Sequence, residues 1–297
     1  MSDKKLKRHV SGWLILDKPF GMTSTQAVGK VRWLYNAEKA GHAGTLDPLA
    51  TGLLPIALGE ATKTVPFAQD GQKRYRFEIA WGAETATDDA EGEIVAVSDA
   101  RPTEAELRAA LPAFTGTIMQ RPPAFSAILV NGERAYDLAR AGKPVELAER
   151  PVTIDELTLI RHNSTHAELE MACEKGTYVR ALARDLARAL GTRGHVTALR
   201  RIAVSGFTEK DAVPLERIEA DDRDTLLKLA AAVLRHLREI RVTEDEAALI
   251  RNGGAILLRG AGAPVAEPAA WASLNGAALA IGAIRAGQFQ PSRVLKP

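Results

Sequence analysis

Short segments in which apolar and polar residues alternate constrain most strongly what this chain can fold into. Residues 73–81 place their aromatic and branched side chains on one face, which predicts a β-strand with one buried and one wet face. Residues 152–159 and 167–173 are expected to pair as further strands, with Cys173 in the core. Because short strands with turn signals outnumber β-α-β patterns, we expect an α+β fold with a mixed, largely antiparallel central sheet and flanking helices.

Helical periodicity is clearest after Tyr178, where apolar residues recur on one face through Leu190. Thr103-x-x-Glu106 is typical of a capping box at a helix start. Ser24 or Thr25 is expected to cap an earlier helix, and residues 224–239 are expected to form a later one.

The C-terminal part differs from the rest in pattern. From Ile240 onward the chain has a short capped helix followed by short strands, with Asn275-Gly276 as a hairpin turn. With 297 residues the chain can hold two domains, which we place at residues 1–239 and 240–297. The second is expected to be small and β-rich.

Composition excludes several classes of protein. Hydrophobic residues make up 46% and charged residues 26%, and no apolar run approaches the ~20 residues of a membrane span. Cys173 is the single cysteine, so neither an intrachain disulfide nor a cysteine-based zinc site can form. The N-terminus is basic but lacks an apolar signal core. We therefore expect a cytoplasmic protein without contact to a membrane. We also expect it to act as a monomer.

The segment Gly41–Gly52, which reads GHAGTLDPLATG, is the strongest candidate for a functional site. It places one carboxylate, Asp47, on a loop between a predicted helix and the apolar run 53–58, and loops often carry working residues. Pro48 biases Asp47 toward an extended backbone. The alternative reading is that Asp47-Pro48 only begins a turn.

Basic residues concentrate in segment 174–201, which holds seven Lys or Arg and, as acidic residues, only Glu174 and Asp185. Arg180, Arg184 and Arg188 follow one another at helical spacing. Because the net charge is only +2, nucleic-acid binding would require such a segregated surface. The cluster is interpreted as a phosphate-tracking surface, with a solvated helix face as the alternative. The basic tail, residues 1–11, is either frayed or an RNA-contacting arm.

Acidic and threonine residues gather in segment 82–92, which could suggest a metal loop. The spacing lacks the ligand set of an EF-hand, so no metal site is expected there.

The string Gly41–Gly52 resembles the catalytic motif of the tRNA pseudouridine-55 synthases, the TruB family, in which the chemistry depends on the motif's Asp. The resemblance continues in DKPFGMTS (residues 17–24), in Lys73-x-Tyr75, in RPPAFSAILVNGERAYDLARAG (residues 121–142), in GTYVRALARDL (residues 176–186) and in TALRR (residues 197–201). Two positions depart from the family pattern: Ala86 stands where the family has Asp, and Leu129 where it has Lys.

The resemblance implies a role for each matching residue. Asp47 would be the catalytic carboxylate and Tyr75 the platform on which the target base stacks, although pattern alone favours Tyr75 as a core residue. Tyr178 and Leu199 would complete the pocket walls. His42 would take the place of the extruded nucleotide, whereas a loop histidine without the resemblance would be incidental. Residues 240–297 would form a PUA-like RNA-binding domain.

The resemblance nominates Arg180 as the partner of Asp47. Burial alone would favour the protonated acid, and a guanidinium would keep the carboxylate ionised. The alternative is that Arg180 contacts a phosphate, as we expect for Arg184.

The predicted activity is the conversion of uridine 55 in the T-loop of tRNA to pseudouridine. The reaction breaks the C1′–N1 bond, turns the uracil and joins C1′ to C5 without net redox change, so no cofactor is expected. Two routes are open to the carboxylate: it attacks the sugar or base, or it removes a ribose proton. The alternative function is a non-catalytic protein that binds and folds tRNA through the same basic groove.

Overall fold

The computed structural model describes residues 7–220, 222–260 and 262–296. Lys4 and Lys5 of the expected RNA-contacting arm therefore lie outside the described residues. The chain divides into two compact units, which are described separately. None of the helices in the described ranges combines the length and the apolar character that a membrane crossing requires.

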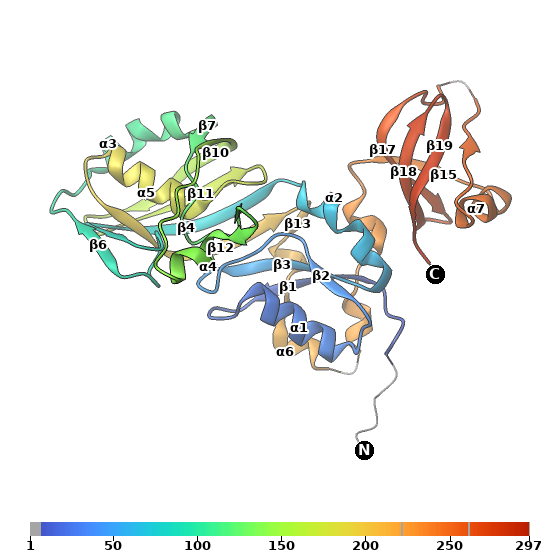
Figure 1. Cartoon of the computed structure of the whole chain (residues 1–297), viewed down its shortest axis with the longest axis horizontal. Coiled ribbons are helices and arrows are strands. Elements are labelled where there is room, and N and C mark those ends of the chain that lie inside the picture. Colours follow the sequence, from blue (N-terminus) through green and yellow to red (C-terminus); the bar gives the residue numbers. More distant parts are fainter. Residues whose placement is uncertain (1–6, 221, 261, 297) are drawn as a thin grey trace, which may run out of the picture. The chain divides into compact units, whose positions relative to one another are not determined.

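The first unit comprises Asp47–Leu53 and Gly71–Glu209 and is built on an antiparallel sheet in the order β12-β4-β11-β10-β7 (Figure 1). β13 pairs with β12 as well, and two small hairpins, β5–β6 and β8–β9, accompany the sheet. Its elements are β4 (Lys73–Trp81), β5 (Ala83–Thr85), β6 (Ile94–Val97), α3 (Glu104–Ala110), β7 (Gly116–Gln120), β8 (Leu129–Val130), β9 (Glu133–Arg134), α4 (Ala135–Arg140), β10 (Arg150–His162), β11 (His166–Cys173), α5 (Val179–Ala189), β12 (Gly194–Val204) and β13 (Phe207–Thr208).

The core of this unit lies between the sheet and α5, which packs against β12 and β4. Phe77 and Ile79 of β4 are buried, as the alternation predicts, and β4 has the predicted bounds. Leu182 and Leu186 of α5 are fully buried against this face of the sheet. Each such side chain contributes about 1.5–3 kcal/mol through burial. The core prediction for Cys173 is confirmed, since its side chain is buried.

The second unit contains the remaining described residues and two groups of strands. One group has the order β14-β1-β3, with β2 beside β3, and the other is a five-stranded sheet in the order β15-β17-β18-β19-β16. The elements are β1 (Gly12–Lys18), α1 (Ser24–Leu34), β2 (Ala40–His42), β3 (Thr51–Leu58, which begins in the first unit), α2 (Val65–Gln69), β14 (Val213–Pro214), α6 (Leu215–Ile218), β15 (Arg238–Arg241), α7 (Glu244–Arg251), β16 (Ile256–Leu257), β17 (Glu267–Leu274), β18 (Ala277–Arg285) and β19 (Gln288–Val294).

Short 3-10 helices connect these elements: Gly59–Thr64, Leu111–Phe114, Glu209–Asp211, Arg223–Leu226 and Ala230–Val233. The sheets are mixed, since β1 pairs with β14 and β12 with β3 in parallel while most other pairs are antiparallel. The predicted fold class is thereby confirmed. The C-terminal sheet has its own core around Ile250, Ile284 and Phe289, as expected of a β-rich segment.

Two predictions of helix position are wrong. Residues 224–239 form two 3-10 turns and the start of β15 instead of one helix. Lys228 exchanges two backbone hydrogen bonds of 2.8 Å with Trp13, which no helix could make at the same time. The cap of α1 is Thr23, whose hydroxyl accepts the Gln26 N–H, and Ser24 instead donates to the Leu46 carbonyl.

Candidate active site

Asp47, on the loop before β3, forms an ion pair with Arg180. The Asp47 Oδ2 atom lies 2.9 Å from Nε of Arg180, which projects from the first turn of α5. The Arg180 side chain is only 6% exposed, whereas the Asp47 side chain is 34% exposed. The guanidinium thus supports an ionised carboxylate that a substrate can still reach. The alternative in which Arg180 serves as a surface phosphate contact is inconsistent with this burial.

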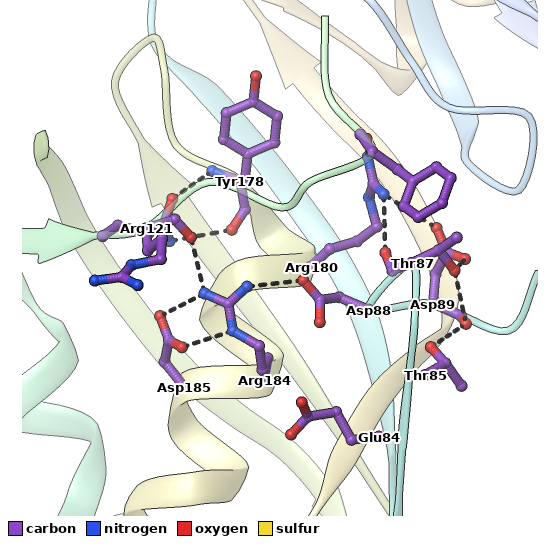
Figure 2. A network of polar contacts seen from close by, with 12 residues as sticks. Glu84, Thr85, Thr87, Asp88, Asp89, Arg121, Tyr178, Arg180, Arg184 and Asp185 are labelled. Atoms are coloured by element: carbon purple, nitrogen blue, oxygen red, sulfur yellow. Dashed lines mark hydrogen bonds and ion pairs between the residues drawn. The ribbon is translucent and has the colours of Figure 1, made fainter. Parts of the chain in front are cut away.

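The guanidinium of Arg180 is fixed on its other sides as well. Nη1 donates to the Thr87 carbonyl at 2.9 Å, and Nη2 donates to the Phe125 carbonyl at 3.0 Å. Nη1 also lies 3.5 Å from Oδ2 of Asp89 (Figure 2). Bonds to two carbonyls and two carboxylates leave the planar group little freedom to rotate. Nε is therefore presented to Asp47 in one orientation.

Asp89 is a site residue that the sequence analysis did not single out. Its side chain is 3% exposed. Oδ1 accepts a hydrogen bond of 2.5 Å from the Thr87 hydroxyl and one of 3.0 Å from the Glu91 N–H. The Thr85 hydroxyl donates to the Asp89 carbonyl. The sequence feature that could have indicated Asp89 is the acidic, threonine-rich composition of segment 82–92. Within the described residues, no group of three or more His, Cys, Asp or Glu side chains is placed to hold a metal ion.

Gly52 allows β3 to approach β12 closely just after the Asp47 loop. Its φ is +94°, and a Cβ atom at this position would lie 2.3 Å from the carbonyl oxygen of Arg201. Thr51 and Gly52 pair in parallel with Arg200 and Arg201 of β12. Only glycine tolerates both this dihedral angle and this close contact. Gly52 therefore lets the end of the loop lie against β12, which places Asp47 beside the central strands.

Tyr75 lies on β4 opposite Arg201 of β12, and Leu199 lies opposite Phe77 two pairs further along. Directly paired residues share a face, so Tyr75 and Leu199 are diagonal neighbours on the face that α5 covers. Burial raises the pKa of the Tyr75 phenol, the charge and hydrogen bond of Arg201 oppose this, and the charge of Asp47 adds to it. Tyr75 is therefore within electrostatic reach of Asp47.

Tyr178 precedes α5 and is held through its backbone. The buried side chain of Gln120 accepts from the Tyr178 N–H at 2.9 Å and donates to its carbonyl at 3.1 Å. The Arg150 guanidinium carbon lies 5.4 Å from the ring centroid, a cation–π contact. In Figure 2 the Tyr178 ring points away from the Arg184 guanidinium. Its backbone is thus rigid while its ring is partly exposed.

His42 lies in the other compact unit, at the end of β2 and opposite Ile56 of β3. Its predicted role beside the target nucleotide stays a prediction. The residues brought together within one unit are Asp47, Tyr75, Arg180 and Leu199, with Tyr178 two residues before Arg180.

The prediction of a phosphate-tracking surface along α5 is wrong for its arginines. Arg184 is buried and pairs with Asp88 and Asp185 at 2.9 Å each. Arg188 pairs with Glu84 at 2.5 Å, and on β12 Arg200 pairs with Glu209. The acids that neutralise the helix come mainly from other elements, so counting acids within residues 174–201 overestimated the positive charge of this surface.

Known proteins are similar to this chain over nearly its whole length. Residues 32–179 match the family model described as "TruB family pseudouridylate synthase (N terminal domain)". Residues 180–239 match "tRNA pseudouridylate synthase B C-terminal domain". The tRNA pseudouridine synthase B of Mesorhizobium japonicum is 51% identical, covering 98% of this chain and 98% of that protein. The protein of the same name from Agrobacterium fabrum is 52% identical, covering 97% and 95%.

Solved structures share the fold. A Cbf5-Nop10-Gar1 complex has a chain with a TM-score of 0.75 and 22% identity, covering 96% of this chain and 85% of that chain. A chain of an archaeal box H/ACA sRNP Nop10-Cbf5 complex has a TM-score of 0.75 and 21% identity, covering 100% and 94%. With relatives above 50% identity over nearly their whole length, the chain belongs to the TruB family of pseudouridylate synthases.

Proposed function

We propose that this enzyme converts uridine 55 in the T-loop of tRNA to pseudouridine and that Asp47 is its catalytic residue. The observation that carries the proposal is the ion pair between Asp47 and the buried Arg180, in which the carboxylate keeps an exposed side. The names of the relatives, tRNA pseudouridine synthase B, support tRNA as the substrate.

The reaction conserves the atoms of the nucleotide apart from protons. The C1′–N1 bond breaks, the uracil turns within the pocket, C1′ bonds to C5, the C5 proton leaves, and N1 takes up a proton. The Asp47 carboxylate acts either as a nucleophile or as a base, and both roles require its ionised form. Arg180 favours that form in a pocket from which water is displaced by the base. No cofactor takes part in this scheme.

The base pocket would be formed around Tyr75. Extruding a stacked base from RNA costs a few kcal/mol, and stacking on an aromatic ring returns about 1–3 kcal/mol. Tyr75 offers that ring within electrostatic reach of Asp47. Tyr178 and Leu199 would form the pocket walls, and His42 would occupy the space that the extruded nucleotide leaves. The fixed backbone of Tyr178 supports a preformed wall.

RNA binding would extend beyond the pocket. We assign residues 240–297 to a PUA-like RNA-binding domain and residues 1–239 to the catalytic domain, and we propose that the protein acts as a monomer in the cytoplasm. The five-stranded sheet with its own core around Phe289 supports a separate binding module at the C-terminus. Single-stranded loops let bases be read on their edges, whereas the stem offers shape and phosphates.

The experiment follows tritium release from 5-tritiated uridine in a whole tRNA transcript, with carbodiimide modification and primer extension to locate the product. We expect the amount of tritium released to correspond to one pseudouridine per tRNA, located at position 55. An isolated T-arm stem-loop should also be a substrate, and an anticodon arm should not. Binding without release would favour a tRNA-folding protein, and product in the anticodon arm would refute the T-loop assignment.

A further inference from the structure

A second buried ion pair lies one helical turn beyond Arg180. Arg184 is 8% exposed, and its Nη1 atom lies 2.9 Å from Oδ2 of Asp88, which is 6% exposed (Figure 2). Its Nε atom donates to Oδ1 of Asp185 at 2.9 Å. Asp88 has a φ of +61°, in the left-handed region that a non-glycine residue adopts at a cost. Its backbone carbonyl accepts the Val196 N–H of β12, which holds it there.

Arg180 and Arg184, on successive turns of α5, bind the same two segments of the chain, residues 121–125 and residues 87–88. Arg180 donates to the carbonyl of Phe125, and Arg184 donates to the carbonyl of Arg121 at 2.8 Å. The two arginines thus fix both ends of residues 121–125. On the other side, Arg180 bonds to the Thr87 carbonyl and Arg184 to the neighbouring Asp88 carboxylate. The acceptors that orient Arg180 therefore lie on segments that Arg184 holds in place.

We propose that the Asp88–Arg184 pair is a positioning device for the catalytic ion pair: it sets the two segments whose carbonyls orient Arg180 toward Asp47. Among the described residues, neither Asp88 nor Arg184 forms an ion pair or hydrogen bond with Asp47, so both act through Arg180. The inference rests on the proposed role of Asp47 and adds to it a pair that neither the motifs nor the relatives' names assign.

The ionisation of Asp88 makes this device sensitive to pH. Burial raises the pKa of Asp88 to about 6, Arg184 and Arg180 of α5 oppose the increase, and Glu84 of β5 adds to it. Asp185, on α5, shares the Arg184 guanidinium with Asp88. Below this pKa the Asp88 carboxyl is neutral and its attraction to Arg184 is lost. Turnover should then fall because a neutral Asp88 no longer fixes Arg184 through an ion pair, and the orientation of Arg180 depends on the segments that Arg184 holds.

The test compares Asp88→Asn and Arg184→Lys with Arg188→Lys in the full-length enzyme. Arg188 is the matched control, because it lies on the next turn of α5, is half exposed and pairs with Glu84. At neutral pH we expect kcat to fall about ten-fold or more in the first two variants, since small displacements of catalytic groups cost about that much, with KM and tRNA affinity within about three-fold. Arg188→Lys should stay close to the wild type.

A pH profile separates positioning from a purely structural role. The wild-type kcat should show an acid limb with a midpoint of about 6, and Asp88→Asn should lack that limb. The Asp88→Asn, Arg184→Lys double variant should lose no more activity than either single variant, because both act on one element. If Arg184→Lys does not fold, the kcat and the pH profile of Asp88→Asn alone test the positioning role.

Several results would overturn the inference. They are a wild-type kcat in Asp88→Asn, an unchanged acid limb in that variant, or a lowered melting temperature with unchanged kcat per folded molecule. The proposed function fails separately, if the wild type releases no tritium or if Asp47→Asn remains active. An inactive Asp47→Asn together with a fully active Asp88→Asn would refute only the positioning role.

Discussion

Replacing Arg180 by lysine tests how the catalytic carboxylate is supported. The guanidinium makes three contacts of 2.9–3.0 Å, to Asp47 and to the carbonyls of Thr87 and Phe125, and a fourth of 3.5 Å to Asp89. A lysine keeps the positive charge but lacks the planar arrangement of donors that the guanidinium has, so it can make only some of these four contacts. Asp89, which is 3% exposed, would lose its own nitrogen contact and would have to share a single ammonium group with Asp47.

The magnitude follows from these contacts. A hydrogen bond to a charged group contributes about 1.5–3 kcal/mol, and the partial exposure of Asp47 places its share toward the lower part of that range. Loss of the Asp47 contact together with the two carbonyls that aim the group should cost about 3 kcal/mol in the transition state, or roughly 100-fold in kcat. Unfolding free energy should fall by about 2–3 kcal/mol, which lowers Tm by several degrees.

The assay is single-turnover tritium release at saturating enzyme, with filter binding for tRNA affinity and thermal unfolding for stability. Arg188→Lys carries the same substitution on the same helix at a half-exposed ion pair and should change kcat less than about two-fold. Arg180→Lys should leave tRNA affinity within a few-fold. Turnover within about three-fold of the wild type would show that Arg180 does not support the chemistry.

Three further predictions concern the base platform, a buried acid and the exposed hairpin. Tyr75→Leu should abolish turnover, while Tyr75→Phe should retain part of it if stacking alone matters; a dead Phe variant in the release assay would assign a role to the hydroxyl. The folded-state pKa of Asp88 is about 6, above its ordinary 3.8, so its contribution to stability is full below about pH 4 and lost as pH rises through 6. Relative to Asp88→Asn, the unfolding free energy of the wild type should therefore fall by about 3 kcal/mol over that pH range, as measured by denaturant titrations. The same pH dependence of the unfolding free energy in both proteins would contradict this. Leu129 is 64% exposed on β8, and Leu129→Lys should tighten tRNA binding and steepen its salt dependence by about one unit of slope, which binding at a series of salt concentrations would measure.

Local patterns predicted the sheet well. β4 has the bounds that alternation indicated, and the capping box at Thr103 and the hairpin turn at Asn275 are where the sequence placed them. Each of these features depends on residues within a few positions of one another. The helix expected at 224–239 failed because the backbone of Lys228 bonds to Trp13, more than two hundred positions earlier in the chain.

The site was less accessible to sequence reasoning for the same physical reason. Asp47 and Arg180 were nominated together only through the family resemblance, because 133 positions separate them. Arg184 was interpreted as a phosphate contact, yet its partner Asp88 is 96 positions away and both are buried. Charge counted along one helix cannot reveal acids that the fold supplies from elsewhere.

The most direct test of the account is tritium release by Asp47→Asn compared with the wild type on the same tRNA transcript. The substitution keeps the shape of the side chain and removes the charge that pairs with Arg180. The account predicts tRNA affinity within a few-fold of the wild type and no release above background, even over long incubation with excess enzyme. Measurable release by Asp47→Asn, in a preparation free of the host's own enzyme, would contradict the central claim.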